Sequence, residues 1–153
     1  MGIFDFLKPQ EEQYYLKFKK MFTSKDRNKI TISVLRVRVM TIQNVIDNLT
    51  ENYHELQEEI QKSIIVNDIK LFKKNSEKRD DLKLKLTVLF RIQSELKNDF
   101  IRGATIKLKE MGYNEIPLNY EGCNRLSNQV SNEHWNLGRY ISDEKIDGYK
   151  HND

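Results

Sequence analysis

Residues 32–60 read ISVLRVRVMTIQNVIDNLTENYHELQEEI and carry the clearest structural pattern in this chain. Apolar side chains return there at steps alternating between three and four residues, through Ile32, Leu35, Val39, Ile42, Ile46, Leu49, Tyr53, Leu56 and Ile60. Such a repeat places one apolar stripe along a helix, and about four heptads of it are typical of long helices packed lengthwise. The stretch therefore predicts one long helix with a helical partner.

The start of this helix leaves two alternatives open. Residues 30–34 alternate and are rich in β-branched side chains, as a strand would be, whereas the heptad pattern continues unbroken from Ile32. We favour the helix and expect its N-cap to be Thr23, Ser24 or Asp26.

A turn is needed after the first long helix. Asn67 and Asp68 supply a turn and an N-cap directly after the stripe ends, and Asn75 with Ser76 forms a second candidate helix start. We place the corner at Asn67-Asp68, with the following helix weakened near Asn75.

The returning helix is expected over residues 69–111. Its own apolar stripe runs through Leu82, Leu86, Leu89, Gln93, Leu96 and Phe100, widened by Leu84, Val88, Ile92 and Ile101. Gly112 directly after it, with lysines in the last turn, is a good C-terminal stop. Two stripes of similar length predict an antiparallel hairpin.

The expected fold class is therefore all-α, with three segments. Residues 1–25 form a basic amphipathic segment with a short helix over 10–22, and residues 26–112 form the coiled-coil-like hairpin. Residues 113–153 are acidic and are expected to form short, partly irregular helices, interrupted by Pro117.

Composition favours an elongated helical protein in the cytoplasm. Only 38% of the residues are hydrophobic and 32% are charged, which suits narrow apolar stripes better than a large core. Cys123 is the only cysteine, so no internal disulfide can form and a reducing compartment is the simple reading. No apolar run approaches the roughly 20 residues that cross a bilayer.

The small net charge of +3 hides an uneven distribution. Residues 1–40 hold nine basic against four acidic residues, and residues 71–112 hold eleven against six, so each block carries +5. Residues 41–70 carry −4, with two basic against six acidic residues, and residues 113–153 carry −3, with four against seven. Two basic blocks indicate either an anionic partner or ordinary solvated helix faces.

The N-terminus carries an unusual apolar cluster of Ile3, Phe4, Phe6 and Leu7. Such side chains either pack on the protein's own core or enter a partner or the interface of a bilayer. Both alternatives stay open from the sequence. In the helix that follows, Lys17, Lys19 and Lys20 lie among aromatic residues, a pattern that fits a core stripe with solvated lysines better than a nucleic-acid site.

No group of residues indicates catalysis. Glu51-x-x-His54 resembles half of a carboxylate-bridged metal motif, but no second copy exists in the sequence, so we expect an exposed histidine and no metal. There is no glycine-rich phosphate loop, nucleophile elbow or cysteine pair. We expect no enzyme activity, no cofactor and an inert Cys123 thiol.

The layout resembles the ESCRT-III family, and its archaeal cell-division members in particular. The likeness covers residues 29–105, including the Asn67-Asp68 corner, the run from Glu77 to Leu82 and the segment from Leu86 to Phe100. The resemblance implies filaments that polymerise on anionic membranes in remodelling or division. It implies membrane insertion by Ile3, Phe4, Phe6 and Leu7, and lipid binding by Lys17, Lys19, Lys20, Lys25, Arg27, Lys29, Arg36 and Arg38. The protein would then be cytoplasmic and peripheral on the membrane.

Self-association is also expected from side chains outside the two stripes. Val34, Val37, Val88 and Ile92 remain for burial against other copies. Two rival functions stay open: a cytosolic coiled-coil adaptor or structural subunit that binds a protein partner, and a helical nucleic-acid-binding protein. Competition between anionic vesicles and DNA would separate lipid from nucleic-acid binding.

Overall fold

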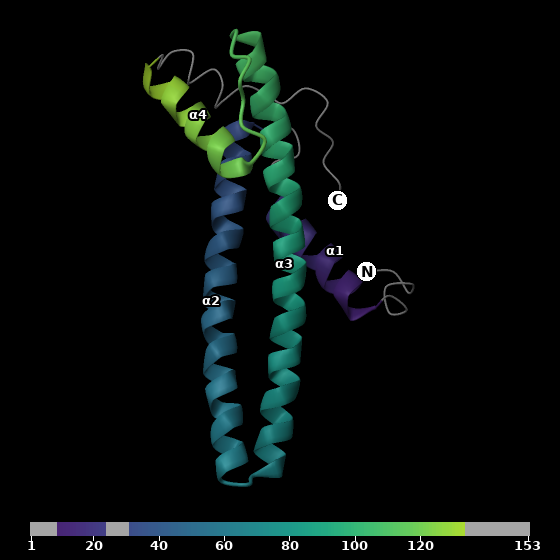
Figure 1. Cartoon of the computed structure of the whole chain (residues 1–153). Helices are drawn as coiled ribbons and strands as arrows, with labels where there is room; N and C mark the ends of the chain where they lie inside the picture. Colours follow the sequence, from purple (N-terminus) through teal and green to yellow (C-terminus); the bar gives the residue numbers. More distant parts are fainter. Residues whose placement is uncertain (1–8, 24–30, 134–153) are drawn as a thin grey trace.

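Four helices make up the part of the chain that the computed structural model describes, residues 9–23 and 31–133. They are α1 (Gln10–Thr23), α2 (Ile32–Ile65), α3 (Ile69–Glu110) and α4 (Tyr120–Glu133). The 34 residues of α2 and the 42 of α3 give arms of about 50 and 63 Å at about 1.5 Å per residue. The two lie side by side as a hairpin, with α1 against α3 and α4 at the open end (Figure 1). The predicted all-α hairpin is confirmed.

The beginning of α2 settles the strand alternative. Thr31 has extended backbone and is the N-cap, because its Oγ1 accepts a hydrogen bond from the Val34 N–H at 3.1 Å. Helix follows directly from Ile32, so a strand over residues 31–34 is wrong. The expectation that Thr23, Ser24 or Asp26 is the N-cap is also wrong, because α2 begins at Ile32 and is capped by Thr31.

The corner of the hairpin lies where the sequence placed it. Asn67 adopts a left-handed backbone conformation with φ +56°, which asparagine tolerates better than most residues. Asp68 then caps α3, its Oδ1 accepting from the Leu71 N–H at 3.0 Å. The expected weakening near Asn75 does not occur, since α3 runs through that residue and buries its side chain.

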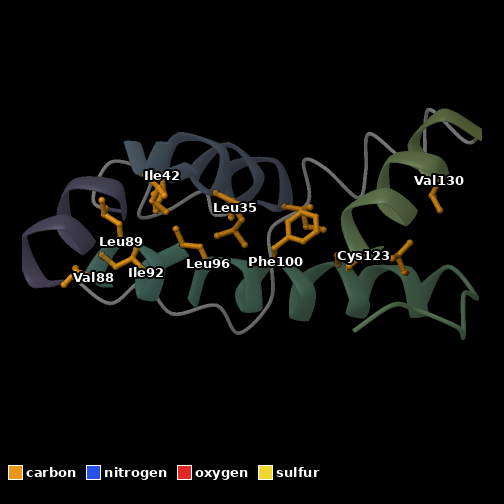
Figure 2. Close-up of a cluster of buried hydrophobic side chains, with 14 residues drawn as sticks. Leu35, Ile42, Val88, Leu89, Ile92, Leu96, Phe100, Cys123 and Val130 are labelled. Atoms are coloured by element: carbon orange, nitrogen blue, oxygen red, sulfur yellow. The ribbon is translucent and has the colours of Figure 1, made fainter. Parts of the chain in front are cut away.

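The core lies in the half of the hairpin next to its open end, where four helices meet. It contains the inward side chains of α2 and α3 together with two from α4 (Figure 2), namely Ile32, Leu35, Val39, Ile42, Ile46, Val88, Leu89, Ile92, Leu96, Phe100, Ala104, Leu108, Cys123 and Val130. Towards the corner, the same stripes are covered only by each other within residues 9–23 and 31–133. Most of their members there are half-buried, namely Leu49, Tyr53, Leu56, Leu82 and Leu86, although Ile60 next to the corner is buried.

One polar residue interrupts the apolar stripe of α3. Gln93 is buried, and its Nε2 donates to Gln43 Oε1 at 2.9 Å and to the Val39 carbonyl at 3.3 Å. A buried polar pair across two helices favours one register, because a slip of either helix would leave the amide without partners.

The end of α3 and the start of α4 are set by local chemistry. Gly112 has φ +96° directly after the C-cap of α3, which confirms the predicted stop. Asn119 Oδ1 accepts from the Gly122 N–H at 2.7 Å and so begins α4. A Cβ at position 122 would lie 2.6 Å from Cβ of Pro117, so glycine allows the close approach of the preceding loop. Cys123 then faces α3 and is fully buried.

Candidate assembly and membrane-binding surfaces

The predicted insertion segment cannot be placed on the structure. Ile3, Phe4, Phe6 and Leu7 lie outside the described residues, as do Lys25, Arg27 and Lys29 of the predicted lipid-binding set. The described members of that set are Lys17, Lys19, Lys20, Arg36 and Arg38, and they divide into exposed and engaged side chains.

Helix α1 packs by its aromatic face. Tyr14, Tyr15, Phe18 and Phe22 contact the core, which favours the core-stripe interpretation of the basic and aromatic pattern. Lys17 and Lys20 are exposed. They are therefore the only residues of the predicted lipid-binding set that the described part of the chain presents to solvent.

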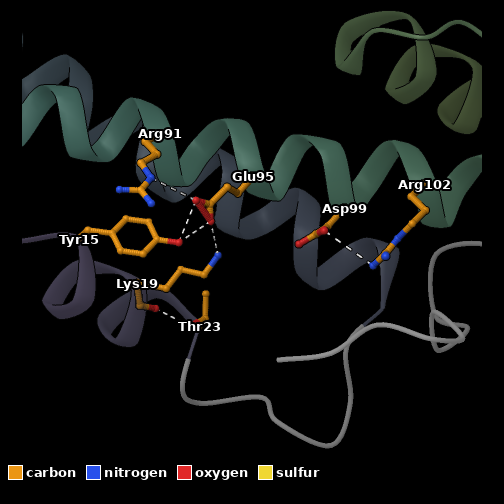
Figure 3. Close-up of polar contacts among 7 residues, drawn as sticks. All are labelled: Tyr15, Lys19, Thr23, Arg91, Glu95, Asp99 and Arg102. Atoms are coloured by element: carbon orange, nitrogen blue, oxygen red, sulfur yellow. Dashed lines mark hydrogen bonds and ion pairs between the residues drawn. The ribbon is translucent and has the colours of Figure 1, made fainter. Parts of the chain in front are cut away.

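Lys19 is occupied by an ion pair with α3. Its Nζ lies 2.9 Å from Glu95 Oε2, and its side chain is only 11% exposed (Figure 3). Tyr15 Oη donates to the same carboxylate at 2.7–2.8 Å. Arg91 contacts both Tyr15 and Glu95. Its guanidinium carbon lies 3.8 Å from the Tyr15 ring centroid, and its Nε lies 3.6 Å from Glu95 Oε1. The predicted lipid-binding role of Lys19 does not fit this geometry.

The pKa values of this cluster reflect the same contacts. Burial by itself raises the pKa of Glu95, but hydrogen bonds from Lys19 and Tyr15 outweigh it, and the net pKa is lowered. Burial and the hydrogen bond to Glu95 raise the pKa of Tyr15 to about 12. The cluster is thus held as a charged carboxylate between a neutral phenol and two cations, and it fastens α1 to the middle of α3.

The two arginines of α2 serve the fold in a similar way. Arg36 Nε donates to Asn124 Oδ1 of α4 at 2.7 Å, and its guanidinium carbon lies 5.6 Å from the Phe100 ring centroid. Burial lowers the pKa of Arg36. Arg38 is buried, and its NH2 group donates to the Thr23 carbonyl at the end of α1 at 3.2 Å. Neither side chain is placed to contact lipid, so this part of the predicted basic surface is structural.

The predicted self-association residues also separate into two groups. Val88 and Ile92 are completely buried within the single chain, because α1 and α2 both pack on that side of α3. Val34 is half-buried, and Val37 is 58% exposed. Met40 was not predicted as an assembly residue, yet it lies one turn from Val37 and is equally exposed. Its spacing of three residues from Val37 was the available signal.

The described residues hold no group of three or more histidine, cysteine, aspartate or glutamate side chains that could bind a metal. Cys123 is buried, and burial raises the pKa of its thiol, which disfavours the reactive thiolate. His54 is exposed beside Tyr53. Among residues 9–23 and 31–133, no helix combines the length and apolar character that a membrane span requires.

Comparisons with models of known families, with curated proteins and with solved structures find no match to this chain. The geometry of the described residues is therefore the basis for a proposed function. It offers a long two-helix arm with half-buried stripes, an exposed apolar pair at Val37 and Met40, and two exposed lysines on α1.

Proposed function

We propose that this chain is a non-enzymatic helical assembly protein, resembling ESCRT-III, that polymerises side by side on anionic membranes in membrane remodelling or division. The proposal includes a homo-oligomer or filament as its active form and a peripheral position on the cytoplasmic side of the membrane. The adaptor with a protein partner is the alternative.

The observation that carries the proposal is the incomplete cover of the hairpin. From Asp47 to the corner on α2, and from the corner to Asp80 on α3, the two helices pack only on each other among the described residues. Leu49, Tyr53 and Leu56 stay half-buried there, although Ile60 is buried. Two packed helices cover only the facing sides of their apolar stripes and leave the flanks of each stripe in contact with water. Most helical stability comes from the packing of such stripes. A second hairpin laid alongside would bury the remainder, and repetition of that contact yields a filament.

The membrane part of the proposal rests on charge. Lys17 and Lys20 are exposed on α1, which follows the apolar N-terminal cluster in the sequence. Each basic residue near an anionic surface contributes about 1 kcal/mol, and a polymer multiplies such weak contacts through avidity.

Sedimentation velocity and negative-stain microscopy test the proposal, each with and without vesicles that contain phosphatidylserine. We expect filaments or large oligomers whose formation increases on these vesicles. Hydrogen exchange should then show added protection in residues 47–63 and 73–80, between the four-helix core and the corner. A monomer at every concentration, on vesicles and off them, would exclude assembly.

Lipid binding is tested separately. Deleting residues 1–8 should weaken vesicle binding even at high salt, whereas Lys17→Gln with Lys20→Gln should act mainly at low salt, where charges are unscreened. Lys83→Gln with Lys109→Gln removes the same charge from exposed positions on α3 and is the control. If the full chain does not bind these vesicles at low salt, the adaptor function replaces the membrane function.

A further inference from the structure

The corner of the hairpin exposes an apolar surface that none of the functions above uses. Six of the thirteen exposed large hydrophobic side chains in the described residues fall within residues 64–72, namely Ile64, Ile65, Val66, Ile69, Leu71 and Phe72. Ile65 is 82% exposed and Ile69 is 74% exposed. Single exposed apolar residues are normal on a surface, but a contiguous group at one end of a rod indicates a binding surface. We call residues 64–72 the hairpin tip.

Three backbone N–H groups at the bend of the tip are paired within the chain. The N–H groups of Val66, Asn67 and Asp68 donate to carbonyls in the last turn of α2 at 2.9–3.2 Å. The Asp68 carboxylate accepts from the Leu71 N–H. A turn that enters an apolar environment with unpaired N–H groups pays several kcal/mol for each of them. None of those three groups is unpaired, so none of them adds this cost when the turn approaches the interface.

A basic collar surrounds the apolar tip. Residues 61–74 contain four lysines, Lys62, Lys70, Lys73 and Lys74, against the single acidic residue Asp68. All four lysines are exposed, and only Lys62 has an ion pair among the described residues, with Glu59 at 3.4 Å. At about 1.5 Å per residue, Lys70 to Lys74 lie roughly 3–9 Å behind Asp68 along the α3 axis. This is the depth that separates the headgroups from an apolar face inserted about 5–10 Å into a bilayer interface.

We propose that the hairpin tip inserts end-on into the interface of an anionic lipid bilayer, with Ile65 and Ile69 at the acyl boundary and the collar lysines on lipid phosphates and carboxylates. The tip is the convex end of a rod, which a fluid bilayer can surround from all sides, whereas a folded partner would need a matching hollow. The excess of lysine over acidic charge selects an anionic surface over another copy of the same basic tip. The contact needs neither polymerisation nor the N-terminal segment.

Tryptophan fluorescence locates the tip directly. The chain has one tryptophan, Trp135, so Ile65→Trp in a Trp135→Phe background reports on the tip alone. Leu118→Trp in the same background is the matched control, because Leu118 is as exposed but lies beyond α3 at the open end. With vesicles of phosphatidylcholine and phosphatidylserine carrying brominated acyl chains, we expect a blue shift and quenching at position 65 and neither at 118. No change at position 65 on vesicles that bind the protein would overturn the proposal.

Two further variants separate the apolar and the electrostatic contributions. Ile65→Ser with Ile69→Ser should weaken vesicle binding about tenfold at all salt concentrations, since two apolar insertions are lost. Lys70→Gln, Lys73→Gln and Lys74→Gln together should weaken it mainly at low salt and on phosphatidylserine vesicles only. All five positions are exposed, so circular dichroism should show an unchanged fold.

The outcomes distinguish this contact from the proposed function. If vesicles still bind and assemble the protein while the tip variants bind as the unmodified chain does, the tip inference fails and the proposed function stands. If the tip variants bind weakly but assembly off the membrane is unchanged, the tip inference stands by itself. If Ile65→Ser with Ile69→Ser alters the oligomeric state without lipid, the tip binds protein, and the lipid proposal is wrong.

Discussion

At the scale of single residues, the most informative side chain is Glu95. It receives Lys19 and Tyr15 from a helix about 76–80 positions earlier in the chain, and Arg91 from the preceding turn of its own helix. The Lys19 ammonium is largely shielded from water, and this carboxylate is its ion-pair partner. The attachment of α1 to α3 therefore rests on one acidic group as well as on aromatic packing.

Replacing that carboxylate should loosen the attachment. Glu95→Ala is expected to lower the free energy of unfolding by about 1–3 kcal/mol, because it leaves a shielded ammonium and a phenol without their acceptor. The lower part of this range applies if Lys19 turns outward to water. Glu77→Ala, at an exposed position of the same helix, should change it by less than about 0.5 kcal/mol in the same urea titration. Equal effects of the two variants would contradict the structural role of Glu95.

The raised pKa of Tyr15 predicts that the stability of the folded chain decreases at alkaline pH. Its pKa is about 12 in the folded chain, against 10.0 for an unperturbed tyrosine. The folded state therefore keeps a proton that the unfolded state loses, so the stabilisation is complete below about pH 10 and falls as the pH rises towards about 12. Urea titrations at several pH values across this interval give the free energy of unfolding of the unmodified chain and of Tyr15→Phe. This free energy should fall less steeply with pH in the variant. Identical slopes would mean that Tyr15 is not coupled to Glu95.

At the scale of the elements, the corner between α2 and α3 depends on one backbone conformation. Asn67 has φ +56°, where a side chain with Cβ is strained and glycine is not. Asn67→Ala should therefore cost about 1 kcal/mol of folding stability, whereas Asn67→Gly should stay within about 0.5 kcal/mol of the unmodified chain. Thermal unfolding measures both. A loss from glycine as large as from alanine would show that the asparagine side chain, rather than its backbone, is what the corner needs.

At the scale of the whole molecule, apolar positions that look alike in the sequence differ in burial. Ile92→Asp should cost about 4 kcal/mol or more, because it places an unpaired charge in a fully buried site. Val37→Asp should leave the unfolding free energy within about 0.5 kcal/mol and reduce assembly in sedimentation velocity. Leu118→Asp adds the same charge at an exposed position and is expected to leave assembly unchanged. If Val37→Asp assembles normally, the exposed pair of Val37 and Met40 is not part of the filament contact.

Much of the fold follows from local patterns. The stripe from Ile32 to Ile60 predicted a long helix and its inward face, and Asn67 with Asp68 predicted the corner at the right residues. These predictions succeed because periodicity, capping and turn preferences act over a few neighbouring residues. The N-cap of α2 was missed because several hydroxyl and acidic residues precede it, and only the actual chain path selects Thr31.

Helix period and charge are properties of the chain read in order, so local patterns were enough to predict a long helical hairpin with two basic blocks. Which of those charges are available depends on how the helices pack. Lys19 and Arg38 are engaged by partners on other elements, and Val88 and Ile92 are covered by α1 and α2. The same structure leaves the tip at Ile65 and Ile69 bare. Burial depends on how helices cross in space, and the crossing of α1 over α3 brings together residues that no short-range pattern connects.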